Sequence, residues 1–367
     1  MSRAIEAHID LSACQANLHT VRRHAPSSQV LAVIKAGGYG HGLVRVARAL
    51  AHAGANWSTG ADAFGVASID EALQLREAGI TTPIVLLEGF FETEELADIA
   101  ARELVTVVHH PWQLAALEAT RLSRPLAVIL KIDTGMHRLG FDPGEVAAAY
   151  RRLVACPAVD GIQFMTHLAC ADERGNEATL RQIDVFAAAT ADLPGARSIA
   201  NSAAVLQWPA SHADWVRPGI MLYGVSPFPD TVGRDEGLAP VMTLKSRLIG
   251  VRRCRRGDTV GYGASWRCPE DMPVGIVAAG YGDGYPRSAP AGTPVLVKAR
   301  RVPLVGRVSM DMLCVDLRSL PHAEVGDEVI LWGAGLPVEE VARHAGTIPY
   351  ELLCRVNARV RFVEHAG

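Results

Sequence analysis

The chain has 367 residues, of which 49% are hydrophobic and 20% charged, and its formal net charge is −3 at pH 7. This length suits one large domain and a smaller one, and the charge gives no electrostatic basis for binding nucleic acid. No stretch approaches the roughly eighteen apolar residues of a membrane span, and the start does not resemble a signal peptide. The seven scattered cysteines lack CxxC spacing, which indicates free thiols rather than disulfides or a metal site. We therefore expect a cytoplasmic protein without a bound metal or a membrane anchor.

From residue 30 to about residue 225, short apolar runs alternate with helical patterns. The eight runs lie at residues 30–35, 63–68, 83–89, 104–110, 126–133, 161–168, 197–201 and 215–224. Eight strands alternating with helices predict an α/β fold, a (β/α)8 barrel of the TIM type. An open doubly wound sheet is the competing fold, but it rarely needs eight units.

Several of the intervening helices carry start and stop signals. Residues 43–50 place four apolar side chains on one helix face, and Gly54 is a plausible stop. Ser68 and Glu71 have the spacing of a capping box for the next helix. Residues 142–145 offer an aspartate cap, a proline at the first helical position and a capping glutamate.

The alternation ends after Gly224, and the linker that follows, residues 226–240, is rich in proline, glycine and charge. Beyond it the apolar period becomes two. The predicted strands lie at residues 241–254, 273–280, 293–300, 302–309, 312–317 and 328–333, with helices only at 338–345 and 350–353. We therefore predict a barrel domain at residues 1–236 and a C-terminal mainly-β domain at residues 237–367.

The segment LAVIKAGGYGHG, residues 31–42, carries the strongest chemical signal. Lys35 ends an apolar strand and is followed by four glycines, at the edge where α/β folds bind ligands. Burial there disfavours the ammonium form, so Lys35 could act as a nucleophile or a base. The alternative is a lysine that extends its amine into water. The glycines favour a site because they let backbone approach a ligand closely.

The other predicted strand ends carry further polar residues. They are Asp133 to Arg138, His167, Asn201 with Ser202, and Arg217 to Ile220. The last two strands of such barrels often hold a phosphate, and Asn201 and Ser202 open a predicted helix whose amides, with those of Gly219 and Ile220, could bind an anion. A lysine opposite a phosphate site suggests pyridoxal 5′-phosphate, held by Lys35 as a Schiff base.

Nine segments then identify a family. In chain order they are AVIKAGGYGHG, KIDTGMHRLGF, MTHLA, NSAA, VRPGIMLYG, VGYGASW, AGYGDGYPR, GRVSMDM and TIPYELLC. With these the chain resembles the alanine racemases over nearly its whole length. The resemblance implies a pyridoxal-phosphate isomerase that interconverts L-alanine and D-alanine. One departure concerns the rigidity of the lysine loop: Gly37 and Gly38 stand where the family usually has Asn or Asp and then Ala.

The resemblance implies two bases on opposite faces of the substrate, Lys35 and Tyr262, as proton exchange between two faces requires. On spacing alone, Tyr262 would be a core tyrosine of the β domain. Arg217 is expected to hydrogen-bond the pyridine nitrogen, to which a guanidinium cannot give a full proton. The ring is then a weaker electron sink, which suits a racemase.

Further cofactor contacts follow from the resemblance. Tyr39 and Tyr350 would bind the phosphate. His167 would orient Arg217 from behind, although an ordinary buried histidine is the equal alternative. Arg138 would hold the substrate carboxylate and the ring oxygen of the cofactor with its planar donor fork. Lys131, often carbamylated in the family, would then neutralise and position Arg138.

The resemblance also implies the substrate contacts and the entrance. Met310 would lie near the substrate carboxylate, with Asp311 behind it, although core filling is a strong alternative for a methionine. Tyr281, Tyr350 and Ile348 would narrow the entrance and so favour alanine over larger amino acids.

A homodimer follows from the same roles, since Tyr262 and Met310 fall in the β domain and Lys35 in the barrel. The family lays one chain's β domain over the other chain's barrel mouth, so we expect a head-to-tail dimer with shared sites. The reaction would supply D-alanine for peptidoglycan or L-alanine in catabolism.

Rival interpretations remain. A broader-specificity amino-acid racemase of the same fold would need a wider entrance. A decarboxylase of this fold would usually place an acid at the pyridine nitrogen, so Arg217 argues against it. A non-catalytic carrier of the cofactor would lack residues 237–367, and a barrel binding protein without a cofactor would be colourless.

Overall fold

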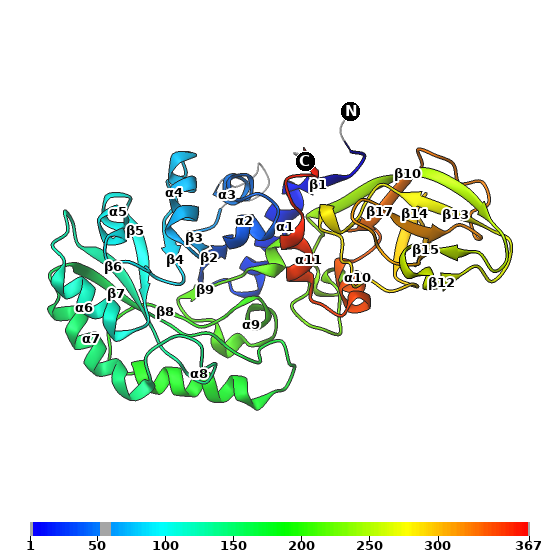
Figure 1. Cartoon of the computed structure of the whole chain (residues 1–367). Coiled ribbons are helices and arrows are strands. Elements are labelled where there is room, and N and C mark those ends of the chain that lie inside the picture. The colour runs from blue at the N-terminus through cyan, green and yellow to red at the C-terminus, as the bar shows by residue number, and fades with distance from the viewer. Residues whose placement is uncertain (1–2, 52–59, 366–367) are drawn as a thin grey trace.

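The computed structural model describes residues 3–51 and 60–365 of the chain. It has two parts, a parallel barrel surrounded by helices and a mainly-β domain, with α10 (Val338–Ala345) and α11 (Pro349–Arg355) between them (Figure 1). The predicted fold class is therefore confirmed. No helix in the described ranges is long and apolar enough to cross a membrane.

Eight parallel strands close the barrel in sequence order, and the last strand pairs with the first. They are β2 (Gln29–Val33), β3 (Ala63–Val66), β4 (Ile84–Leu86), β5 (Leu104–Val108), β6 (Leu126–Lys131), β7 (Val159–Met165), β8 (Arg197–Ser198) and β9 (Trp215–Val216). Alternate residues of the strands face inward and fill the barrel with apolar side chains, among them Leu31, Val85, Val107 and Ile129. The filled interior leaves only the barrel ends free to bind a ligand.

The helices of this part cover the outside of the barrel. They are α1 (Leu11–His24), α3 (Leu43–Ala51), α4 (Ile69–Glu77), α5 (Glu95–Ala101), α6 (Pro111–Ala119), α7 (Val146–Ala155), α8 (Glu177–Thr190) and α9 (Ser202–Gln207), whereas α2 (Lys35–Tyr39) is a short turn after β2 with left-handed residues inside it. The predicted apolar face of residues 43–50 is buried in α3, as expected. The predicted stop at Gly54 lies outside the described residues.

Three local predictions in the barrel domain were wrong. The eighth strand ends at Val216 instead of continuing to residue 224, because Pro218 cannot donate to a sheet ladder and a 3-10 turn, η3 (Ile220–Tyr223), follows. Ser68 precedes α4, but its side chain makes no capping hydrogen bond. Residues 142–145 also lack a side-chain cap and form a 3-10 turn, η1 (Pro143–Glu145), ahead of α7.

The second part contains all six strands that the period of two predicted. They are β10 (Met242–Cys254), β13 (Met272–Val277), β14 (Pro294–Val297), β15 (Arg300–Val305), β16 (Leu313–Asp316) and β17 (Glu328–Trp332), and a short hairpin adds β11 (Thr259–Val260) and β12 (Trp266–Arg267). The sheet order is β13-β16-β15-β14-β17-β10-β1-β18, and β13 also pairs with β10. The two predicted helices correspond to α10 and α11.

One segment falls outside the predicted division at residue 236. The strand β1 (Glu6–Asp10) lies between β10, to which it is antiparallel, and β18 (Arg361–His365), to which it is parallel. Its side chains Ala7 and Ile9 are fully buried, so apolar contact holds it in the second sheet. The first and the last of the described strands therefore belong to the same sheet.

Two buried polar side chains fix the linker between the parts. Glu339 of α10 accepts hydrogen bonds from the backbone N–H groups of Ser226 (2.9 Å) and Gly233 (2.8 Å). Asn17 of α1 donates to the carbonyl oxygen of Ala239 (2.8 Å) and accepts from its N–H (2.9 Å). The backbone of the linker thus supplies hydrogen-bond partners to both buried side chains, as the burial of polar groups requires. These hydrogen bonds hold the linker at both of its ends.

Candidate active site

A cavity of about 730 Å³ opens at the carboxyl ends of the barrel strands. Twelve of the predicted site residues line it: Lys35, Tyr39, Lys131, Arg138, His167, Asn201, Ser202, Arg217, Gly219, Ile220, Ile348 and Tyr350. The last two belong to α11 and the residue before it, so the second half of the chain closes one side of the cavity. The residues predicted from strand ends and those predicted from the resemblance to a family therefore line one cavity.

The loop after β2 turns with the left-handed backbone conformation. Ala36, Gly37, Gly38 and Tyr39 have φ values of 54°, 63°, 66° and 49°, a region that glycine adopts without strain. A Cβ on Gly40 would lie 2.1 Å from the carbonyl oxygen of Leu353 in α11. Only glycine fits there, and its close approach packs the lysine loop against α11.

Hydrogen bonds fix this loop where the sequence departs from the family pattern. The N–H of Gly37 donates to Glu71 Oε1 (3.3 Å), whose other oxygen accepts from Ala67 N–H (2.9 Å). The Glu71 carboxylate thus accepts a hydrogen bond from the lysine loop and does not form the predicted capping box with Ser68. A Cβ on Gly37 would meet no atom within 4 Å, so the residue type at this position is not set by packing.

The amine of Lys35 faces a carboxylate that the sequence analysis missed. Lys35 Nζ lies 3.7 Å from Glu88 Oε1, and both residues line the cavity. Glu88 follows β4 at the carboxyl end of a predicted strand. The rule that found Lys35 and His167 would have found it, had the end of this strand been considered.

Arg217 is buried in the floor of the site and held by neutral acceptors. It donates to Ser198 Oγ (2.7 Å) and to the carbonyl oxygens of Thr166 (2.6 Å) and Ile199 (3.2 Å). Burial lowers the pKa of Arg217 to about 10, which leaves it charged at neutral pH. These hydrogen bonds, and none from His167, orient the guanidinium.

Two neighbours of Arg217 lose basicity because they are buried close to positive charge. Burial, reinforced by Arg217 and Lys131, lowers the pKa of His167 to about 3, so its imidazole is neutral. Burial, then Arg217 and Arg138, lowers the pKa of Lys131 to about 8. Lys131 is only 8% exposed, and its amine is therefore partly neutral near physiological pH.

The loop after β6 carries Arg138 to the mouth of the cavity. Asp133 Oδ1 accepts hydrogen bonds from three successive backbone N–H groups, residues 135–137, at 3.0 to 3.1 Å. Phe141 then pairs back with Lys131, its N–H donating to the Lys131 carbonyl oxygen (2.9 Å). The loop is thus closed at both ends, and Arg138, which is exposed, lines the cavity.

Hydroxyl and amide groups gather at the ends of β8 and β9. Ser202 Oγ accepts from Gly219 N–H (2.8 Å), and Asn201 caps α9 through a bond from Ala204 N–H (3.1 Å). The Tyr39 hydroxyl oxygen lies 2.5 Å from the point that a Cβ on Gly219 would occupy. Burial raises the pKa of Tyr39 well above its ordinary value, so its hydroxyl stays a donor.

The donor set of the cavity fits pyridoxal 5′-phosphate. Lys35 offers an amine for its aldehyde, and the hydroxyls of Tyr39 and Ser202 lie beside Gly219 for its phosphate. Within the described residues, Arg217 donates its hydrogen bonds to neutral acceptors. A buried guanidinium satisfied by neutral acceptors retains its full charge for a ligand nitrogen or oxygen.

Four predicted site residues lie outside this cavity, in the β domain. Tyr262 is 68% exposed and Met310 51% exposed, and Tyr281 and Asp311 are also open to solvent. Figure 1 shows β12, which follows the Tyr262 turn, at the end of the molecule away from the barrel. A single chain therefore does not bring Tyr262 and Lys35 together.

The Tyr262 turn projects the side chain outward. Gly261, Gly263 and Ala264 have φ values of 74°, 71° and 47°, so three left-handed residues surround the tyrosine between β11 and β12. Two glycines make such a turn possible at low strain. The predicted bend is thus present, and the core position that spacing alone favoured for Tyr262 is wrong.

Comparison with known proteins identifies the family of both parts. Residues 9–227 match the family described as alanine racemase, N-terminal domain, and residues 241–364 match alanine racemase, C-terminal domain. The chain is 57% identical over 366 residues to an alanine racemase of Halorhodospira halophila, covering 98% of each, and 53% identical over 355 residues to one of Shewanella baltica, covering 96% and 97%.

Solved structures give the same result. A biosynthetic alanine racemase from Pseudomonas aeruginosa superposes with a TM-score of 0.95 at 48% identity, covering 99% of this chain and 100% of that one. The alanine racemase from Acinetobacter baumannii superposes with a TM-score of 0.91 at 35% identity over 99% and 100%.

Proposed function

The chain belongs to the alanine racemase family, a family of pyridoxal-phosphate enzymes, and from that premise we propose that it interconverts L- and D-alanine as a cytoplasmic head-to-tail homodimer. The observation that carries the dimer is the separation of the two bases. Lys35 lines the barrel cavity, whereas Tyr262 is exposed on the other domain. A second copy completes the site. The product serves as D-alanine for peptidoglycan or as L-alanine in catabolism.

When bound, pyridoxal phosphate withdraws electrons from an attached amino acid and so acidifies its Cα–H. Lys35 would hold the cofactor through its amine, and the same amine would hold or move a proton at Cα on one face. The partner subunit's Tyr262 does so on the opposite face. Two groups on opposite faces are what inversion at Cα requires.

The remaining residues bind and orient. The phosphate would be held by six residues that line the cavity: Tyr39, Tyr350, Asn201, Ser202, Gly219 and Ile220. Arg217 would donate a hydrogen bond to the pyridine nitrogen and, with a pKa of about 10, would keep its own proton. His167 lines the same cavity as a neutral imidazole. An arginine at the ring nitrogen favours racemisation over decarboxylation.

The substrate end of the site is polar on one side and narrow on the other. The substrate carboxylate is bound by Arg138 of this chain and by Met310 of the partner subunit. Asp311 of the partner subunit lies behind Met310. Ile348 and Tyr350 line the cavity mouth, and Tyr281 of the partner subunit narrows it. A broader-specificity racemase is the alternative, and a panel of L-amino acids assayed by optical rotation separates the two.

Lys131 is expected to be carbamylated. Only a neutral amine reacts with CO2, and with a pKa near 8 roughly a tenth of Lys131 is neutral at pH 7, since each pH unit changes the ratio tenfold. The carbamate would give Arg138 an anionic partner. Modification should grow as the pH rises through 8 and decline below it, because the amine then gains a proton.

A high-resolution crystal structure grown with bicarbonate tests this modification. We expect density for a carboxylate continuous with Lys131 Nζ and none at Lys245, a more exposed lysine paired with Glu328. An unmodified Lys131 amine at full occupancy would contradict the prediction.

Mixing two inactive variants tests the shared site. Lys35→Ala and Tyr262→Ala chains, combined in equal amounts and allowed to exchange subunits, should regain about a quarter of the wild-type activity. Half of the dimers are then mixed, and one of the two sites in each mixed dimer is complete. The readout is D-alanine formed from L-alanine per mole of chain.

The control is a mixture of Lys35→Ala chains with chains that carry both substitutions, which can form no complete site. No recovery in the first mixture, with subunit exchange verified by differently tagged chains, would favour sites built within one chain.

A further inference from the structure

Two loops of the β domain carry the exposed residues Tyr281 and Met310. Backbone hydrogen bonds join the two loops directly. The N–H of Tyr281 donates to the Ser309 carbonyl oxygen (3.1 Å), and the N–H of Gly282 donates to that of Met310 (2.9 Å). A Cβ on Gly280 would lie 2.3 Å from the Ser309 oxygen. The loops therefore form one tightly packed unit.

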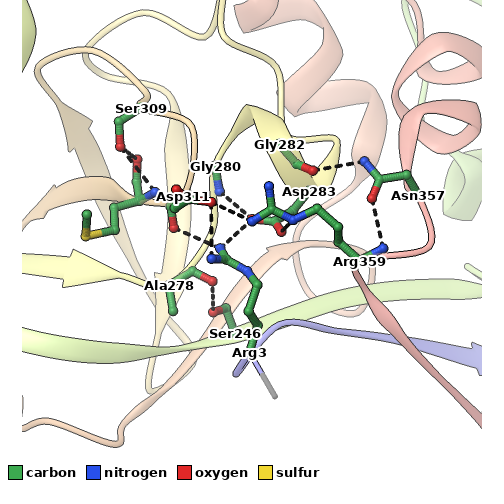
Figure 2. A network of polar contacts seen from close by, with 11 residues as sticks. Arg3, Ser246, Ala278, Gly280, Gly282, Asp283, Ser309, Asp311, Asn357 and Arg359 are labelled. Atoms are coloured by element: carbon green, nitrogen blue, oxygen red, sulfur yellow. Dashed lines mark hydrogen bonds and ion pairs between the residues drawn. The ribbon is translucent and has the colours of Figure 1, made fainter.

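A fully buried carboxylate anchors the first loop (Figure 2). Asp283 Oδ2 accepts from the N–H of Gly280 (3.0 Å) and from Arg3 Nη2 (2.7 Å), and Asp283 Oδ1 lies 3.5 Å from Arg359 Nε. A buried carboxylate is stable only with charge partners and hydrogen bonds. Both arginines are therefore needed to keep Asp283, and its loop, in place.

The same arginines hold the second loop. Arg3 Nη2 donates to the backbone oxygen of Asp311 (2.9 Å), and Arg3 Nη1 lies 3.3 Å from its carboxylate. Arg359 Nη2 donates to the same carboxylate. The planar guanidinium suits this task because it can bond two acceptors at once. Each arginine thus bridges both loops.

The two arginines come from opposite ends of the chain. Arg3 precedes β1, and Arg359 lies between α11 and β18, the strand that pairs with β1. Asn357, two residues earlier, donates to the Gly282 carbonyl oxygen (3.0 Å). Tyr350 of α11 lines this chain's own cavity. The segment that follows α11, with Asn357 and Arg359, therefore supports two loops that lie outside that cavity.

We propose that Arg3 and Arg359, through Asp283 and Asp311, are positioning residues that hold Tyr281 and Met310 in the geometry in which they meet substrate in the partner subunit's site. The proposal rests on the proposed shared-site dimer. Among the described residues, those that line the barrel cavity do not include Arg3, Asp283 or Arg359, so we expect these three to act through the loops. Loosening them should weaken substrate binding more than it slows the proton transfers at Lys35 and Tyr262.

The experiment uses the mixture of Lys35→Ala and Tyr262→Ala chains described above. In its one complete site, the Lys35→Ala chain supplies the β domain, so Asp283→Asn is added to that chain. We expect the KM for L-alanine to rise about tenfold with kcat changed by less than about threefold, the pattern for loss of binding made equally in ground and transition states. The matched control is Asp316→Asn, which breaks another buried carboxylate–arginine pair of this domain, with Arg318, and should leave KM unchanged.

An unchanged KM in a pair that complements, or a loss of kcat alone, would overturn the positioning role, whereas absence of complementation before Asp283 is changed would overturn the shared site. Arg359→Lys and Arg359→Gln cover the case in which Asp283→Asn does not fold. Gln should raise KM and Lys, which keeps the charge, should restore part of the binding. Equal KM values for both variants and the wild type would also overturn the proposal.

Discussion

Replacement of Lys35 by alanine is expected to reduce the rate of alanine racemisation by at least about 10³-fold, in the upper part of the range for loss of a general base. The Lys35 amine lines the cavity and can form a Schiff base with an aldehyde. The variant should lose the visible absorbance of the bound cofactor at the same time. Optical rotation of L-alanine solutions and an absorbance spectrum of the purified protein measure both effects.

Lys298→Ala is the matched control, because Lys298 is half exposed and pairs with Asp327 far from the barrel cavity. It should keep the wild-type rate and colour. Borohydride reduction of the wild type should fix the cofactor on the peptide that contains Lys35. A colourless wild-type protein, or a Lys35→Ala protein that still interconverts the enantiomers unaided, would contradict the assignment.

Replacement of Tyr262 by phenylalanine is expected to slow racemisation by about 10²- to 10⁴-fold, the range for one acid–base group. The change removes a single oxygen and keeps the ring. Lys35 would still exchange a proton on its own face, so in deuterated water only one alanine enantiomer should exchange its Cα hydrogen rapidly. Proton NMR of L- and D-alanine incubated separately with the variant measures this difference.

Tyr150→Phe controls for loss of a tyrosine hydroxyl, since the Tyr150 hydroxyl donates to the Pro194 carbonyl oxygen at 3.4 Å, and phenylalanine keeps the ring that lies 5.7 Å from that of Phe164. Fast exchange of both enantiomers by the Tyr262→Phe enzyme would mean that one base serves both faces. That result would leave Lys35 as the sole base.

The barrel could be predicted because its signals are local. Each strand is a short apolar run, and parallel strands bring their carboxyl ends to one mouth, so Lys35, His167 and Arg217 could be grouped without a structure. The strand β1 could not be found in this way. Its five residues, EAHID, mix polar and apolar side chains, and its partners β10 and β18 lie hundreds of residues away.

The site was less predictable where its chemistry depends on contacts between distant segments. Nothing near Ser68 indicates that Glu71 bonds the lysine loop. The acceptors that hold Arg217 include a serine hydroxyl and two backbone oxygens, which leave no pattern in the sequence. For Tyr262, spacing favoured a core position, and only resemblance to a family indicated a functional one.

The placement of β1 has a consequence for the order in which the molecule can be completed. Translation runs from the N-terminus, and domains generally fold as they emerge from the ribosome. The eight barrel strands are all present once Val216 has been made, but β1 has no partner until β10 has followed, and its second partner, β18, comes from the last residues described. The strand β1 is therefore synthesised early but is among the last strands to be fully paired. In a nascent chain released before β18 is made, one edge of β1 would stay unpaired and open to strands of other molecules.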